Sequence, residues 1–156
     1  MRKEVRSAKV FSVILTLFVS DVIGMMPMPF RIGFEFQMGG ELCKWAMEDY
    51  TLQKSPIFEV GMRGEKLFHI ELDGPDIEFV TIPFSHLSGE EVRLRECVGL
   101  ITNTVELMMQ LCVGADNSTT IGRWFDESSK ISHIWMQKHD LFAKIAERPI
   151  KKPQLL

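Results

Sequence analysis

The segment that decides the fold is His69-Ile-Glu-Leu-Asp-Gly-Pro-Asp-Ile-Glu-Phe-Val-Thr-Ile-Pro-Phe84, taken together with the earlier segment Arg31-Ile-Gly-Phe-Glu-Phe-Gln37. In both segments apolar residues alternate with polar ones. Because successive side chains of a strand point to opposite faces, residues two positions apart share a face. The polar members that alternation groups in this way are Glu35, Gln37, His69, Glu71 and Asp73. If the strands are neighbours, they build a sheet with one apolar face and one face rich in carboxylates.

Predicted strands surround these segments and are joined by short turns. Their expected ranges are 30–37, 56–62, 66–72 and 76–82. The turns Arg63-Gly64-Glu65 and Asp73-Gly74-Pro75 carry the residues that favour chain reversal. Strands connected this closely pair antiparallel. We therefore expect an α+β fold, in which helices pack on one face of an antiparallel sheet of about four strands.

Helices are expected between and after the strands. Their ranges are 41–50, 88–112 and 128–147. The middle helix begins with Ser88-Gly-Glu-Glu91, the pattern of a capping box, in which Ser88 and Glu91 satisfy backbone N–H groups reciprocally. The buried stripe expected from the spacing of three and four residues is Leu94, Val98, Ile101, Val105, Met108 and Cys112.

Composition places the chain among ordinary globular proteins. Of its 156 residues, 46% are hydrophobic and 25% are charged, which allows one domain, expected at 25–147 and followed by a basic tail at 148–156. The net charge of −3 gives no electrostatic basis for binding nucleic acid. The cysteines form no metal-binding motif, and their odd number argues against a closed set of disulfides. Cys97 and Cys112 fall in the apolar helical pattern and are expected in the core.

Residues 1–24 have the composition of a secretory signal, with a basic start before an apolar run at 10–19. This run is too short for a spanning helix, which needs ~20 apolar residues, so no stable membrane span is expected. Two alternatives are an amphipathic N-terminal helix and a translation start at Met25 or Met26. A signal implies a secreted or periplasmic protein, whereas the later start implies a cytoplasmic one.

The carboxylates of the polar face are the residues best suited to chemistry. They are Glu35, Glu59, Glu71, Asp73 and Glu78, from several strands. Oxygen ligands on a rigid sheet suit Mg²⁺, which bridges protein carboxylates and substrate phosphates and neutralises charge in phosphoryl transfer. The alternative is that they form the ordinary solvated face of an antiparallel sheet. The sequence contains no glycine-rich phosphate loop and no Gly-x-Ser-x-Gly, His-Glu-x-x-His or Cys-x-x-Cys motif.

Two short motifs resemble a known superfamily. Gly33-Phe-Glu-Phe-Gln37 is similar to the Gly-x-Glu-x-Glu strand that opens the amidoligase branch of the glutamine synthetase-like superfamily, the carboxylate–amine ligases. Asp73 followed by Ile77-Glu-Phe-Val-Thr-Ile-Pro83 is similar to its next landmark, an acidic strand before a helix. The resemblance implies an antiparallel sheet that binds ATP and Mg²⁺, activates a carboxylate as an acyl phosphate and joins it to an amine.

By position, the resemblance makes Glu35, Gln37 and Glu78 the cofactor-binding residues. Glu35 and Glu78 would hold the metal, with Glu71 and Asp73 adding negative charge. The chain departs from the family at Gln37, which replaces a glutamate and removes one anionic ligand.

The resemblance ends near residue 112, because the family's later His-x-His strand has no match after Leu87. We therefore expect the front part of such an enzyme, truncated or degenerate. If active, it would take small-molecule or peptide carboxylate and amine substrates. The alternative is a non-catalytic interaction protein, secreted or cytosolic, that uses the same sheet. The ligase hypothesis requires Glu35 and Glu78 to project from adjoining strands toward one cation.

Overall fold

The computed structural model describes residues 12–14, 31–38, 54–73, 76–85, 89–114 and 116–152. Its centre is a six-stranded sheet. The strands, in spatial order, are β1 (Ser12–Ile14), β3 (Glu35–Met38), β6 (Asp76–Thr81), β5 (Glu65–Asp73), β4 (Ser55–Met62) and β9 (Ile134–Lys138). All neighbouring strands pair antiparallel. The predicted α+β class with an antiparallel sheet is confirmed.

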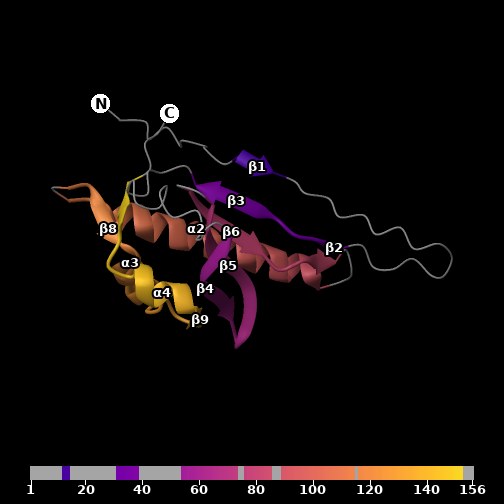
Figure 1. Ribbon diagram of the computed structural model, residues 1–156. Helices are drawn as coiled ribbons and strands as arrows, with labels where there is room; N and C mark the ends of the chain where they lie inside the picture. Colours follow the sequence, from indigo (N-terminus) through magenta and orange to yellow (C-terminus); the bar gives the residue numbers. More distant parts are fainter. Residues whose placement is uncertain are drawn as a thin grey trace, which may run out of the picture.

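Smaller elements surround this sheet (Figure 1). Two short antiparallel ladders join β2 (Arg31–Ile32) to β7 (Phe84–Ser85), and β8 (Ser118–Thr120) to β10 (Pro149–Lys151). The helices are α2 (Glu90–Leu111), α3 (Ile121–Ser128) and α4 (Asp140–Ile145). In Figure 1, α2 lies behind the sheet, and α3 and α4 lie together beside β4 and β9.

The hairpin predicted between β4 and β5 is present. Its turn residues, Arg63 and Gly64, both have positive φ angles of 55° and 82°. Positive φ at both central positions gives the turn the twist of the flanking strands, and glycine adopts this conformation without steric cost. β5 then pairs with β6 from Phe68 opposite Thr81 to Asp73 opposite Asp76. The central three strands therefore follow the sequence prediction closely.

The helices pack on the apolar face of the sheet. Register places Phe58 opposite Ile70, and Ile70 opposite Phe79, so these three side chains share that face. The indole ring of Trp124 in α3 packs edge-on against Phe58 and Phe79, with ring centroids 5.5 and 6.1 Å apart. Its Nε1–H donates to the carbonyl oxygen of Thr104 in α2 at 3.0 Å. One fully buried indole thus joins both helices to the sheet.

The helix predicted at 128–147 is wrong. α3 ends at Ser128, residues 134–138 form β9, and α4 follows after a short break. The apolar spacing in this region fits a helix, but the free edge of β4 offers backbone partners that only an extended segment can use. The chain turns into β9 at His133, which has φ 69°. Arg123-Trp-Phe125, just before the predicted helix, lies in α3.

The long helix α2 is confirmed, with one correction to its buried side. Its N-cap is Gly89, with φ 93°, and the predicted capping box depends on Ser88, which lies outside the described residues. The buried stripe is Cys97, Leu100, Ile101, Thr104 and Met108, with Cys112 buried beyond the helix end.

Val98 is 39% exposed instead of buried. The polar side chains of Thr104 and Cys97 are buried on the core side of the helix, and the hydrogen-bond donor of each has an acceptor there. The Thr104 hydroxyl donates to the carbonyl oxygen of Leu100 at 2.8 Å, and the Cys97 thiol donates to that of Leu67 at 3.6 Å. Burial raises the pKa of the Cys97 thiol to about 12, so it stays protonated in the core as expected.

The first predicted strand and the C-terminal tail also need correction. Residues 30–37 are divided, because the Phe34 N–H donates to Thr81 Oγ1 at 2.8 Å instead of continuing a ladder. Within the basic tail, residues 149–151 form β10, since the Ile150 side chain is only 2% exposed and anchors the strand opposite β8.

Two predictions fall mainly outside the described residues. These are the helix at 41–50 and, apart from β1, the signal at 1–24. In β1, the backbone of residues 12–14 pairs with Glu35–Gln37. None of the helices described is both long and apolar enough for a membrane crossing.

Candidate functional site

The register brings the sequence-predicted residues onto one face of the sheet. Gln37 of β3 lies opposite Glu78 of β6, and Glu78 lies opposite Glu71 of β5. Glu35 and Asp73 lie two positions from Gln37 and Glu71, and therefore share this face. Glu35 and Glu78 are thus diagonal neighbours on adjoining strands, a relation in which residues lie about 7–8 Å apart. We call this surface the carboxylate face.

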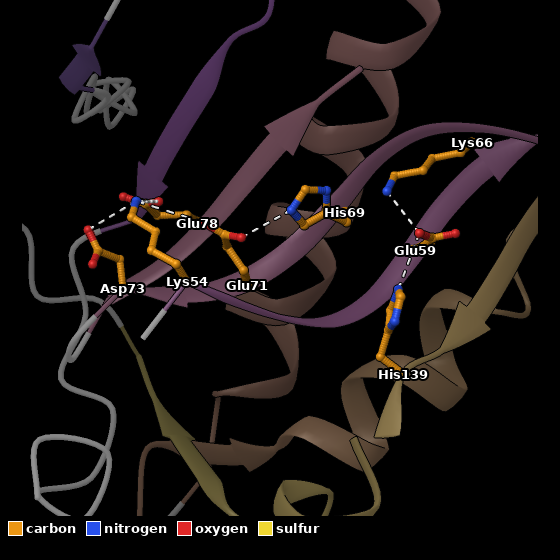
Figure 2. Close-up of polar contacts among 8 residues, drawn as sticks. All are labelled: Lys54, Glu59, Lys66, His69, Glu71, Asp73, Glu78 and His139. Carbon is orange, nitrogen blue, oxygen red and sulfur yellow. Dashed lines mark hydrogen bonds and ion pairs between the residues drawn. The ribbon is translucent and has the colours of Figure 1, made fainter. Parts of the chain in front are cut away.

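The side chain of Lys54 lies among three carboxylates at one end of this face (Figure 2). Its Nζ is 2.6 Å from Glu78 Oε2, 3.4 Å from Asp73 Oδ2 and 3.8 Å from Glu71 Oε1. The Glu78 and Glu71 side chains are 4% and 9% exposed, whereas that of Lys54 is 54% exposed. Two buried carboxylates and a third at the rim therefore share one ammonium that reaches them from the solvent side. We call these four residues the Lys54 cluster.

The electrostatics of the cluster follow from burial and pairing. Hydrogen bonding to Glu78 raises the pKa of Lys54, which keeps it an ammonium. The pKa of Glu78 is also raised, because the burial that disfavours its charge outweighs the stabilisation by Lys54. A positive charge at this position is therefore what allows several carboxylates to sit together at the end of the sheet.

Sequence reasoning did not identify Lys54. The residue precedes β4, and its backbone N–H donates to the carbonyl oxygen of Leu72 at 2.7 Å. Its φ of 55° is in the left-handed region, which is uncommon for residues other than glycine. No motif marks this position. The signal that could have identified it is a lysine directly before β4, since the strands that follow, β5 and β6, carry the three acidic residues of the cluster.

The remaining polar residues of the face have local partners. The Gln37 amide Nε2 donates to Asp76 Oδ2 at 2.8 Å. His69 Nε2 is 3.1 Å from Glu71 Oε2, so Glu71 lies between His69 and Lys54. Burial lowers the pKa of His69, although Glu71 opposes this shift. The imidazole of His69 is therefore expected to be neutral at neutral pH.

A second cluster lies farther along the same face (Figure 2). Lys66 Nζ is 2.8 Å from Glu59 Oε1, and His139 Nε2 is 3.2 Å from the same oxygen, without a hydrogen bond of good geometry. Hydrogen bonding to Lys66 lowers the pKa of Glu59. Because its single carboxylate is 19% exposed and has a lysine of its own, this cluster has no excess of negative charge to attract a further cation.

The carboxylates of the Lys54 cluster are the right kind of ligand for a metal ion, but they are not arranged as a metal site. Carboxylate oxygens are hard ligands of the kind that Mg²⁺ prefers. The ammonium of Lys54, 2.6 Å from Glu78, already stands where a cation would be attracted. As they are placed, however, the described residues contain no group of three or more His, Cys, Asp or Glu that could hold a metal ion. A metal would have to exchange with Lys54.

Comparisons with protein-family models, with curated proteins and with solved structures returned no match to this chain.

Proposed function

We propose that the chain is an amidoligase-like domain whose carboxylate face binds a magnesium–nucleotide complex for ATP-dependent carboxylate–amine ligation. The observation that carries the proposal is the burial of Glu78, which is only 3% exposed. Glu78 lies on the same face as Glu35 of the adjoining strand and is paired with the ammonium of Lys54. Burying an acid is costly unless a positive partner is available, so a face that buries acids together is suited to cations.

Each residue of the face would have a distinct part. Glu35 and Glu78 would hold the metal, and Glu71 and Asp73 would add negative charge beside it. The metal, when bound, would neutralise the phosphate charge of the nucleotide. Gln37 would contribute a neutral oxygen in place of an anionic one. The His69–Glu71 contact, 3.1 Å long, would hold Glu71 in one orientation.

Thermal unfolding of the full chain tests this proposal. Magnesium–ATP should raise the melting temperature in a concentration-dependent manner, because a ligand at a hundred times its Kd adds ~2.7 kcal/mol. Glu78→Gln should abolish the shift, while Glu59→Gln, on the same face but outside the Lys54 cluster, should retain it. Release of ADP that requires both a carboxylate and an amine substrate would then establish ligation. No shift for the unmodified chain at millimolar magnesium–ATP would reject the proposal.

A second candidate function is a non-catalytic interaction domain. It is favoured by the pairing already present, since Lys54 neutralises the acids and the Gln37 amide is engaged by Asp76. In that case the face is complete without a ligand. Substitution of Lys54 would then change only the stability of the fold, and neither magnesium nor magnesium–ATP would compensate for it.

A further inference from the structure

The outer edge of β9 is open. β9 is the last strand of the six-stranded sheet, and in the part of the chain that the structure describes no strand pairs with its outer side. The helix that follows, α4, packs on the apolar face of the sheet, where the ring centroid of Phe142 lies 6.2 Å from that of Phe58. An open edge presents unpaired backbone N–H and C=O groups, which can pair with a further strand.

One hydrogen bond identifies the backbone groups that point outward. The His139 N–H donates to the carbonyl oxygen of Ile57 at 3.0 Å, and these residues continue the register of β9 and β4. Hydrogen-bonded pairs alternate with non-hydrogen-bonded pairs along an antiparallel ladder, so Gln137, two positions earlier, also bonds to β4. The N–H and C=O groups of Met136 and Lys138 therefore point away from the sheet.

β9 lacks the features that usually protect an edge. Natural sheets protect an exposed edge with proline or with charged side chains placed along it. The strand Ile134–Lys138 contains no proline, and its one charged residue is Lys138. The Lys138 ammonium lies 4.6 and 4.5 Å from the ring centroids of Phe125 and Phe142, so its charge is directed onto the helices. The apolar side chains of the strand remain partly exposed, and the edge is open to pairing.

We propose that the partner of this edge is a second copy of the same chain, and that β9 pairs antiparallel with β9 of that copy about a twofold axis at Met136. This inference goes beyond the proposed function and does not depend on it. A twofold contact uses the same edge of both copies and closes on a dimer, whereas pairing with a different surface would continue into a filament.

The backbone of β9 is complementary to itself in this register. Met136 faces Met136 of the second copy, and each donates its outward N–H to the carbonyl oxygen of the other. Lys138 faces Ile134 of the second copy, so the outward N–H of Lys138 meets an outward carbonyl oxygen. The N–H of Ile134 is already engaged by the carbonyl oxygen of Ile131 at 3.3 Å. The twofold pairing therefore uses the outward donors and needs no donor that is already engaged.

The side chains also favour a second copy as the occupant. Trp135 lies on the carboxylate face opposite Gly61 of β4, so its neighbour within the chain has no side chain at that position. In the dimer its outer neighbour is Gln137 of the second copy. On the opposite face, Met136 lies beside Met136. Lys138 lies beside Ile134 and not beside the other lysine, so the register brings no like charges directly opposite each other.

Amide hydrogen exchange and analytical ultracentrifugation of the full-length chain test the pairing. Raising the protein concentration should slow the exchange of the Met136 and Lys138 amides, because these N–H groups become bonded only in the dimer. The amide of Gln137, which already bonds to β4, should change little. Sedimentation should show a reversible monomer–dimer equilibrium without larger species.

Substitutions by proline separate the two sides of the strand. Met136→Pro removes an outward N–H and no hydrogen bond to β4, and an edge strand tolerates proline at such a position. It should raise the Kd of the dimer at least ~tenfold, because a bond is lost from each copy, and leave the melting temperature of the monomer nearly unchanged. Met136→Leu keeps the N–H and should dimerise as the unmodified chain does. Gln137→Pro should lower the melting temperature, because it removes a hydrogen bond to β4.

The outcomes decide the proposal without magnesium or nucleotide, so its failure is distinct from that of the proposed function. A chain that stays monomeric up to millimolar concentration would overturn it, as would a dimer that Met136→Pro leaves equally stable. If Met136→Pro does not fold, exchange of the unmodified chain decides: protection of Met136 and Lys138 in the dimer supports the pairing, and its absence overturns it. Growth beyond the dimer would overturn the twofold contact.

Discussion

The two faces of the central sheet are stabilised in different ways. On the apolar face, Phe58, Phe79 and Trp124 are at most 1% exposed, and both phenyl rings contact the indole of Trp124. On the carboxylate face, Glu71 and Glu78 are nearly as buried, at 7% and 3%, yet each lies within ion-pair distance of the Lys54 ammonium. Apolar burial is non-directional and shared among many contacts, whereas a buried carboxylate depends on one partner. The apolar face therefore supplies most of the stability of the fold, whereas the carboxylate face determines where a positively charged group can bind.

Removing the indole that joins the helices to the sheet should have the largest effect. Trp124→Ala is expected to lower the free energy of unfolding by about 3–5 kcal/mol, because it leaves a cavity. Urea denaturation measures the change. Val113→Ala is the matched control, because that side chain is 72% exposed and should change stability by less than about 0.5 kcal/mol. A loss below 1 kcal/mol for Trp124→Ala would show that the apolar face is not the main source of stability.

Two glycine-to-alanine substitutions, one in strand β4 and one in helix α2, should have opposite effects on stability. A Cβ on Gly61 would collide with the carbonyl oxygen of Glu65, so Gly61→Ala should cost about 1–3 kcal/mol. Gly99 in α2 has no atom within 4 Å of the same position, and Gly99→Ala should stabilise the helix by about 0.5–1 kcal/mol. Thermal unfolding would give shifts of opposite sign. An unchanged or raised melting temperature for Gly61→Ala would mean that the close approach at Gly61 is relieved at no cost.

Acid should destabilise the carboxylate face through His69. Burial lowers the pKa of His69 in the folded chain, so the unfolded chain binds its proton more readily. Stability from this residue is therefore present above the ordinary histidine value of 6.5, and is lost as pH falls through the lowered folded pKa. The unmodified chain should lose stability relative to His69→Gln over that interval.

Nuclear magnetic resonance of the imidazole checks the direction of this shift. Glu71→Gln should lower the pKa of His69 further, because the hydrogen bond that the Glu71 carboxylate accepts from His69 Nε2–H opposes the effect of burial. A ring that titrates at or above the ordinary value in the folded chain would contradict the predicted pH dependence.

The smallest effect is expected at the more exposed ion pair. A double-mutant cycle of Lys66 and Glu59 should give a coupling of about 0.2–1 kcal/mol, reduced by salt. The equivalent cycle of Lys54 and Glu78 should give a larger coupling, because the Glu78 side chain is 4% exposed and that of Glu59 is 19% exposed. Equal couplings would remove the distinction between the two clusters.

Much of the sheet could be predicted because local signals determine it. Alternation identified which side chains of β4, β5 and β6 share a face, and the Arg63–Gly64 turn set their pairing. The adjacency of β3 and β6 was a hypothesis, since a strand early in the chain can join either edge of a hairpin pair. The register confirms it by placing Gln37 opposite Glu78.

The remaining features depend on contacts distant in sequence. β9 was predicted as helix because Ile131, Ile134 and Trp135 have helical spacing, and only its pairing with β4 makes it a strand. Lys54 was missed for a similar reason, because its proximity to Glu78 depends on the backbone conformation at one residue. Alternation can assign a side chain to a face, but it cannot identify the counter-ion that comes from outside the strands.

The late position of β9 has a consequence for synthesis. β4 is complete after Met62, but its outer neighbour is not made until Lys138 has left the ribosome. During that interval the nascent domain exposes a bare strand edge of the kind that promotes aggregation. The topology therefore leaves this edge of β4 without its strand partner until the segment Ile134–Lys138 has been made.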